Sequence, residues 1–382
     1  MIYLDNAATS WPKAPGVIEA MNEAMRTAGG NPGRSGHRLS VAAARLVYDA
    51  RDDLAQFFGV SDPSRVVFTA NATHALNQAI RGLVTPGDRV VVTGMEHNAV
   101  MRPLRDLEAQ GVEVTVVPAE ADGWVSAEAL RAALRHPARL VVATHASNVT
   151  GTLLPIAEFA RAAHESGAWL VIDAAQTAGV VPIDLRALGV DLLAFTGHKE
   201  LYGPPGIGGL VIADHFDPTV IRPLVCGGTG SRSESELQPR DLPDRFESGT
   251  PNLPGIAGLG ASIRWLREFG FEWIRVHREQ IHAALLDGLA DIPRLRVYGT
   301  RDVLRSVAIV SLSVGEHPVS RVGHILDQEF DIMTRVGLHC APAAHQSIGS
   351  FPSGTVRLAP GLFTTETEVA QTLGALREVA RR

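Results

Sequence analysis

The chain has 382 residues, of which 45% are hydrophobic and 20% are charged, as in an ordinary globular protein. Its formal net charge of -6 and its lack of Lys/Arg runs argue against nucleic acid as a partner, because phosphate backbones attract clustered positive charge. No segment contains the roughly 20 consecutive apolar residues of a membrane helix, and the first residues do not form a signal peptide, so we expect a cytoplasmic protein with no membrane partner.

Short apolar segments alternate with helical patterns along the first two thirds of the chain. The predicted strands are 66–69, 89–93, 113–117, 140–144, 169–173, 192–195 and 209–213. Helices are predicted at 40–58 and 155–166. Apolar strands that alternate with helices are typical of a mainly parallel sheet covered on both faces, which predicts an α/β fold.

The pattern changes after Pro254. Helical periodicity at 256–269 and 272–289 leads into a strand at 307–313, which predicts a second, smaller α+β domain. We therefore expect a large domain over 15–254 and a small domain made of 1–14 and 255–382. The segment 227–254 is rich in Gly, Ser and Pro and is expected to cross the site without regular structure.

Two strand ends carry a lysine and an acid. Lys199 follows one strand in the sequence Thr196-Gly-His-Lys199, and a lysine fixed there can form a Schiff base. Asp173 ends another strand, where a carboxylate can pair with the ring nitrogen of pyridoxal phosphate (PLP), and Gln176 can reach the phenolic oxygen of the ring. A surface lysine and a helix-capping aspartate are the ordinary alternatives.

Three more strand ends carry polar residues. Thr73 lies just before a helix predicted at 75–83, whose free N–H groups favour a phosphate, although simple helix capping explains the same residue. His97 can stack on a planar ring and move protons, although a lone histidine is usually structural. Asn148 can bind a ligand carboxylate or ring oxygen. Open α/β sheets bind ligands at the carboxyl ends of their strands, so the five segments together predict one site.

Eight short motifs are spread over most of the chain. They are Tyr3–Ala8, Asn31–His37, Glu96–Asn98, Ser147–Asn148, Asp173–Gln176, Thr196–Lys199, Glu247–Asn252 and Arg335–Ala341. With them, the sequence resembles the class V aminotransferases, which are PLP enzymes of fold-type I, and among these the cysteine desulfurases. The resemblance implies a PLP cofactor, a fold-type I α/β domain with a smaller α+β domain, and a homodimer with a shared active site.

The resemblance also assigns roles around the cofactor. Lys199 would carry the Schiff base, Asp173 would hold the pyridine nitrogen and Gln176 would donate to the phenolic oxygen. His97 would stack on the ring and donate a proton. The phosphate would be held by four side chains, namely Thr73, Thr196, His198 and, in the partner subunit, Thr250. One departure is Ala72-Thr73-His74, where the family often has Thr-Thr-Glu.

For the substrate, the resemblance assigns Asn148 and Arg357 to the carboxylate, since a planar guanidinium binds carboxylates bidentately. Cys340 resembles the sulfur-accepting cysteine of the selenocysteine lyase-like, SufS-like branch. Its neighbours His339 and His345 are expected to favour an exposed and reactive thiol, with a small core residue as the alternative. The only other cysteine, Cys226, matches no family role and is interpreted as structural.

The predicted function is therefore PLP-dependent removal of sulfur from L-cysteine, giving L-alanine and a persulfide on Cys340 that a sulfur-acceptor protein takes up. The alternatives are a selenocysteine lyase acting on L-selenocysteine, a β-eliminating lyase, an aminotransferase, or a binding scaffold without turnover. No Gly-x-Gly-x-x-Gly or Walker sequence follows a strand, which disfavours a nucleotide-binding protein. Two distant cysteines cannot form a disulfide framework or a Cys-based zinc site, and no metal centre is expected.

Overall fold

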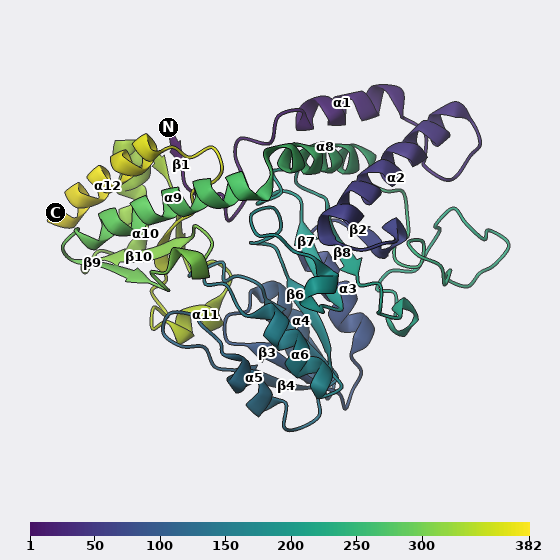
Figure 1. The fold of residues 1–382 in the computed structure, drawn as a ribbon, viewed down its shortest axis with the longest axis horizontal. Coiled ribbons are helices and arrows are strands. Elements are labelled where there is room, and N and C mark those ends of the chain that lie inside the picture. The colour runs from purple at the N-terminus through teal and green to yellow at the C-terminus, as the bar shows by residue number, and fades with distance from the viewer.

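A seven-stranded sheet forms the centre of the computed structural model, which describes residues 1–382 (Figure 1). Its strands are β2 (Val66–Thr69), β3 (Arg89–Thr93), β4 (Glu113–Val117), β5 (Leu140–Thr144), β6 (Trp169–Asp173), β7 (Leu192–Thr196) and β8 (Gly208–Ile212). Their order is β2-β8-β7-β6-β5-β3-β4, and only β8 runs antiparallel to its neighbours. The strand positions predicted from the sequence and the α/β fold are confirmed.

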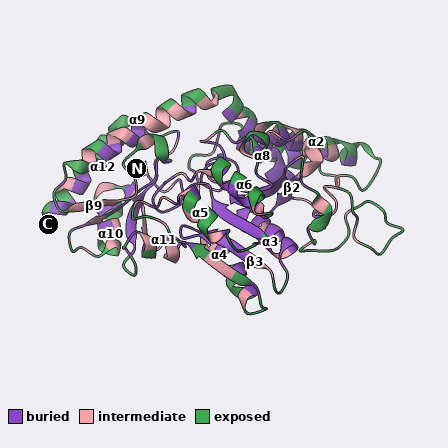
Figure 2. Cartoon of the chain, turned by 60° about the horizontal axis from the view of Figure 1, so that its bottom comes forward, coloured by how far each residue is buried: buried purple, intermediate pink, exposed green.

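Helices cover both faces of this sheet, so its strands are almost wholly buried, apart from the edge strand β4 (Figure 2). They are α2 (Arg38–Phe58), α3 (Ala72–Leu83), α4 (Asn98–Glu108), α5 (Ala127–Ala133), α6 (Ile156–Glu165) and α7 (Leu185–Leu188). Two further helices, α1 (Val17–Thr27) and α8 (Leu253–Phe269), pack together beside α2. Helix α2 begins at residue 38, two residues before the predicted start, because the His37 ring caps it by accepting from the N–H of Ser40.

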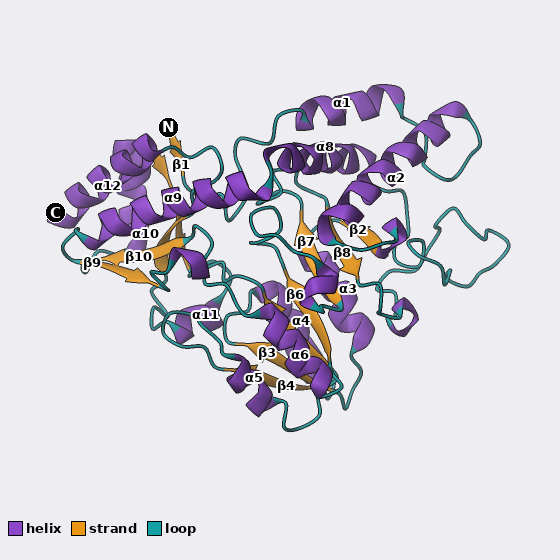
Figure 3. Cartoon of the chain, viewed as in Figure 1, coloured by secondary structure: helices purple, strands orange, loops and turns teal.

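A smaller antiparallel sheet lies at the other end of the molecule (Figure 3). It has the order β12-β13-β10-β9, with β9 (Leu295–Tyr298), β10 (Val310–Val314), β12 (Arg335–Gly337) and β13 (Thr355–Leu358). The first strand, β1 (Ile2–Tyr3), pairs in parallel with β11 (Ile332–Met333). The helices here are α9 (Phe271–Ala290), α10 (Val319–Phe330), α11 (Pro342–Ser347) and α12 (Glu366–Arg381). This α+β unit was predicted, but its strand β10 begins three residues later than the sequence indicated.

The buried apolar residues form two main cores. The larger has 81 residues and surrounds the seven-stranded sheet, including the apolar face of α8. The smaller has 22 residues, drawn from Ile2 and Leu4 and from positions 281–380. Leu4 is buried in the second core and Ala7 in the first. The residues after β1 therefore pass from the small unit to the large one. None of the helices combines the length and the apolar character that crossing a membrane requires.

Candidate active site

The loops after β2, β3, β5, β6 and β7 meet in one pocket at the carboxyl edge of the large sheet. Eight of the residues proposed from the sequence line it: Thr73, His97, Asn148, Asp173, Gln176, Thr196, His198 and Lys199. They are brought together because parallel strands end at the same edge of a sheet. Cys340, Arg357 and Thr250 are not among the lining residues.

The amine of Lys199 makes no side-chain hydrogen bond or ion pair. Burial lowers the pKa of Lys199 to about 8; Arg357 and Arg335 act in the same direction, while Asp173 opposes them. A lysine tuned in this way is partly neutral near physiological pH. The neutral amine is the form that attacks an aldehyde.

Asp173 ends β6 and is only 5% exposed. Its Oδ1 accepts from the N–H of Ala175 at 2.9 Å, and its other oxygen has no hydrogen bond within the chain. Burial raises the pKa of Asp173, whereas the bond from Ala175 and the charge of Lys199 lower it. The second oxygen is thus free to accept from a protonated ring nitrogen.

Two buried polar atoms in the pocket have no partner in the protein. They are Oε1 of Gln176 and Oγ1 of Thr196. Nε2 of Gln176 donates instead to the carbonyl of Ala7 at 3.1 Å, so the amide in this orientation presents an acceptor, and not the predicted donor, to the pocket. Burial without a hydrogen bond is costly, so these atoms point to a polar ligand.

His97 caps helix α4. Its Nδ1 accepts from the N–H of Ala99 at 3.0 Å, which leaves the ring proton on Nε2. Burial, followed by the charge of Lys199, lowers the pKa of His97 to about 4, so the ring is neutral. The imidazole can therefore stack on a planar ring and donate from Nε2 at the same time.

The first turn of α3 forms the side of the pocket suited to an anion. Asn71 caps this helix by accepting from the N–H of His74 at 2.9 Å, and Thr73 is exposed in the first turn. His198 lies nearby, and burial lowers its pKa to about 4. Free N–H groups, a hydroxyl and a helix dipole together suit a phosphate.

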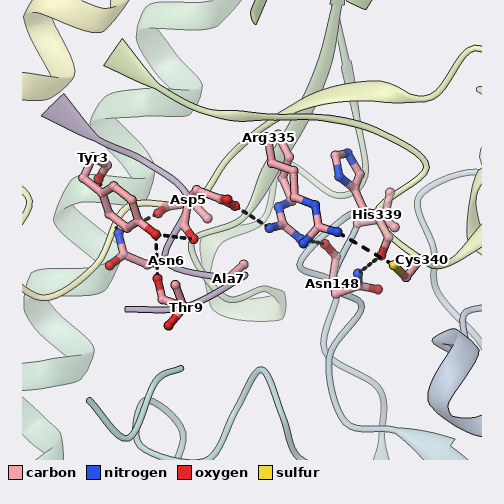
Figure 4. Close-up of polar contacts among 12 residues, drawn as sticks. Tyr3, Asp5, Asn6, Ala7, Thr9, Asn148, Arg335, His339 and Cys340 are labelled. Atoms are coloured by element: carbon pink, nitrogen blue, oxygen red, sulfur yellow. Dashed lines mark hydrogen bonds and ion pairs between the residues drawn. The ribbon is translucent and has the colours of Figure 1, made fainter. Parts of the chain in front are cut away.

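Arg357 lies beside this pocket in β13 and is 1% exposed. One guanidinium nitrogen, Nη2, contacts Oδ1 of Asp5 at 2.7 Å, and Nη1 donates to the carbonyl of Asn148 at 3.0 Å. The two residues assigned to a substrate carboxylate are therefore adjacent. The amide of Asn148 donates to the carbonyl of His339 at 2.7 Å (Figure 4). Nε of Arg357 has no partner.

Cys340 lies in the loop between β12 and α11, with an exposed side chain. Its carbonyl accepts from the N–H of Asn98 at 2.8 Å, which holds the loop beside His97. Positive φ angles at His339 (47°) and Cys340 (58°) turn the chain sharply at this point. Nη2 of Arg335 is 3.7 Å from the sulfur (Figure 4).

The prediction that His339 and His345 favour a reactive thiol is wrong. The ring of His339 is buried and pairs through Nε2 with Oγ1 of Thr355 at 2.9 Å, and that of His345 is buried and pairs with Ser350. Neither ring has a hydrogen bond to the sulfur, because each is bonded to another side chain. Cys226 is exposed as well, so it is not a core residue.

Thr250 lies outside the pocket of its own chain. It is exposed on a neighbouring groove, where its Oγ1 accepts from Nδ2 of Asn31 at 3.3 Å. The segment 227–252 is irregular, as predicted, and α8 begins at Leu253, so the irregular segment ends two residues earlier than predicted.

Four residues that support the site were assigned no role from the sequence. Asp5 and Arg335 contact Arg357 and Cys340 as described above. Nζ of Lys13 donates to the carbonyl of His198 at 3.0 Å, next to the reactive lysine. Glu96 is fully buried and accepts from Oγ1 of Thr93 and from the N–H of Thr144, which ties the ends of β3 and β5 together.

Comparison with known proteins identifies the family. The sequence profile described as aminotransferase class-V matches residues 2–372. This chain belongs to that family. A probable cysteine desulfurase of Methanothermobacter thermautotrophicus is 35% identical, with 99% of this chain and 94% of the relative covered. A cysteine desulfurase of Pectobacterium atrosepticum is 33% identical, with 100% and 93% covered.

Solved structures of the family have the same fold. The apo structure of a cysteine desulfurase from Thermococcus onnurineus NA1 superposes with a TM-score of 0.92 at 33% identity, covering 100% of this chain and 94% of that one. The cysteine desulfurase CsdA from Escherichia coli gives a TM-score of 0.89 at 27% identity, covering 99% and 94%.

The cofactor of the family is PLP, and the pocket has groups that suit each part of it. A partly neutral lysine suits the aldehyde, and a free carboxylate oxygen suits the ring nitrogen. The unpartnered Oγ1 of Thr196 and the first turn of α3 suit the phosphate. A neutral imidazole at position 97 suits the ring face. The residues present therefore fit PLP.

Proposed function

We propose that the protein is a PLP-dependent cysteine desulfurase that converts L-cysteine to L-alanine and leaves the sulfur as a persulfide on Cys340. The observation that supports this most is an exposed cysteine beside the pocket that contains Lys199 and Asp173. A transaminase has no use for such a thiol. The cysteine desulfurases among its full-length relatives point to the same reaction.

Bound PLP supplies an electron sink that stabilises negative charge at the substrate Cα. Asp173 would keep the ring nitrogen protonated, because it is the only carboxylate among the residues that line the pocket. Lys199 would hold the cofactor, and its free amine would take the Cα proton on Nζ. Its pKa of about 8 leaves part of the amine neutral for this step.

Arg357 and Asn148 bind the substrate carboxylate. Asp5 holds the buried guanidinium in place and shares it with the incoming carboxylate. We also propose that the amide of Gln176 turns over when the cofactor is bound, because only its NH₂ group can donate to the phenolic oxygen.

Sγ of Cys340 attacks the substrate sulfur. The substrate Cβ–S bond breaks and an S–S bond forms on Cys340, while His97 relays the proton of the Cys340 thiol to the substrate side and ends the step as the same neutral ring. Summed over the reaction, L-cysteine and the Cys340 thiol become L-alanine and the Cys340 persulfide, so no external oxidant is needed. Arg335 orients the sulfur from 3.7 Å.

We propose two protein partners. A second copy of the chain would cover the groove that carries Thr250, and Thr250 of the partner subunit would join Thr73, Thr196 and His198 at the phosphate. The exposed position of Cys340 lets a sulfur-acceptor protein approach the persulfide. L-Selenocysteine has the same carboxylate and amine and would enter by the same contacts.

Absorbance and product assays test the proposal. The purified protein should be yellow and should form alanine and sulfide from L-cysteine with a reductant. Lys199→Ala should lose the yellow species and turnover together, whereas Cys340→Ser should stay yellow and lose sulfur output. Cys226→Ser is the matched control, since it removes the other exposed thiol and should be as active as the wild type. Wild-type sulfide output from Cys340→Ser, or pyruvate in place of alanine, would refute the assignment.

A further inference from the structure

A second cluster of polar side chains lies at the opposite edge of the large sheet. His164 is at the end of α6, Asp191 directly precedes β7, and His215 follows β8. Because β8 runs antiparallel to β7, its carboxyl end returns to the edge where β7 begins. Asp191 and Thr196 are five residues apart along this strand, or roughly 16 Å, so the cluster is distinct from the active site.

The two imidazoles converge on one carboxylate. Nε2 of His164 is 3.0 Å from Oδ2 of Asp191, and Nε2 of His215 is 2.9 Å from Oδ1. The N–H of Leu170 also donates to Oδ2, at 2.7 Å, which fixes the carboxylate to the sheet. The three candidate ligand atoms all lie within 4.8 Å of one another.

The charge of this carboxylate is not balanced by the protein's permanent cations. The Asp191 side chain is only 3% exposed, and no Lys or Arg lies within ion-pair distance of it. By contrast, the partly buried Glu247 is held by Arg51 at 2.7 Å. The two imidazoles carry a charge only when protonated, so a bound cation would supply the permanent counter-charge that the protein does not place beside Asp191.

We propose that His164, Asp191 and His215 bind a divalent cation of the zinc type. Two imidazole nitrogens and one carboxylate oxygen are ligands that Zn²⁺ prefers, and three protein ligands leave a position for water. The N···O separations of 2.9 and 3.0 Å are close to the spacing of about 3.4 Å between ligands of a tetrahedral ion with bonds of about 2.1 Å.

The ligand atoms, which lie within 4.8 Å of one another, would have to approach to about 3.4 Å to close the site. The rings are 41% and 47% exposed, so both can adjust and water can reach the ion. Their planes are 81° apart and their centroids are separated by 6.1 Å. The ion would tie the end of α6 to the start of β7 and the end of β8. The prediction of no metal centre considered only the cysteines and could not detect ligands that folding brings together.

Zinc retention by the PLP-loaded protein tests the proposal. All samples carry Cys226→Ser and Cys340→Ser, because thiolates also bind zinc. The protein is first treated with a chelator, which is then removed. Zn²⁺ is added, and unbound metal is separated by gel filtration. About one zinc per chain should remain. The same protein with His164→Gln and His215→Gln should keep less than about a tenth of that, while His136→Gln, which changes another exposed histidine, should keep all of it.

Zinc should also raise the unfolding temperature by roughly 2–5 °C in the two-cysteine variant, and not in the His164→Gln/His215→Gln protein. Crystals of the unmodified holoprotein grown with Zn²⁺ should give an anomalous peak between the three side chains, which makes the test independent of how the variants fold. Equal zinc in the two proteins, no retained zinc, or no peak would show a hydrogen-bonded His–Asp–His unit and overturn the proposal.

Discussion

The reactivity of Lys199 is set by opposing neighbours. Burial, Arg357 and Arg335 lower its pKa to about 8, and Asp173 acts against them. Because only the neutral amine attacks an aldehyde, PLP uptake by the apoprotein should accelerate about tenfold per pH unit below pH 8 and level off above it. Rapid-mixing absorbance, followed by borohydride reduction to trap the lysine adduct, measures this rate.

Arg335→Gln provides the matching comparison for this profile. It removes one of the charges that lower the pKa of Lys199, so the plateau should begin at a higher pH than in the wild type. A wild-type rate that continues to rise towards pH 10 would show that Lys199 behaves as an ordinary exposed lysine.

Single residues could be predicted from the sequence where one strand end carries the chemistry by itself. Asp173 and Lys199 each follow a recognisable buried strand. Asp5 and Arg357 are 352 residues apart, and their ion pair exists only because a bridge between Asp5 and Ala359 joins the chain after β1 to the chain after β13. The expected effect of His339 on Cys340 failed for a related reason, since adjacency along the chain does not decide where two side chains point.

Strands β12 and β13 hold the Cys340 loop through a close glycine contact. A Cβ added at Gly354 would lie closer to the backbone of Gly337 than any normal Cβ contact, at a φ of +75°. Gly354→Ala should therefore push β12 and Cys340 away from the pocket, and a displacement of about 1 Å can cost of the order of 100-fold in turnover. Sulfide release measures the loss, and the yellow absorbance should persist.

Gly349→Ala is the control that distinguishes the steric contact with Gly337 from the strain of a left-handed backbone. Gly349 has nearly the same φ, +74°, but a Cβ there would meet nothing within 4 Å. Both variants carry the cost of a left-handed residue, about 1 kcal/mol, and only Gly354→Ala should lose sulfide release. Equal losses in the two would show that the contact between β12 and β13 does not position the cysteine.

The elements of the large sheet were predictable because its strands are short, continuously apolar and bounded by helices. The direction of β8 was not, since a strand buried on both faces has the same composition whether it is parallel or antiparallel. That direction is what returns His215 to the edge occupied by Asp191.

At the scale of the whole molecule, two cores divide the chain unequally. We propose that the small unit consists of the first residues and of the chain from within α9 onward, because α8 packs with α1 and α2 in the larger core. The sequence placed this boundary at residue 254, where its composition changes. A change in composition along the sequence does not show that the next helix, α8, packs in the larger core.

The proposed dimer predicts that two inactive variants can repair each other. If Thr250 serves the partner subunit, a heterodimer of Lys199→Ala and Thr250→Ala chains contains one fully wild-type site, in which Lys199 and Thr250 come from different chains. Random reassortment makes half of the dimers mixed, so about a quarter of all sites should be active. Desulfurase activity should then rise above that of either variant alone after co-refolding.

Mixing Lys199→Ala with Asp173→Asn is the control. Both residues line the pocket of the same chain, so every site in a mixed dimer carries one of the two substitutions and no activity should be regained. No gain with the Thr250→Ala partner would place this threonine outside the shared site.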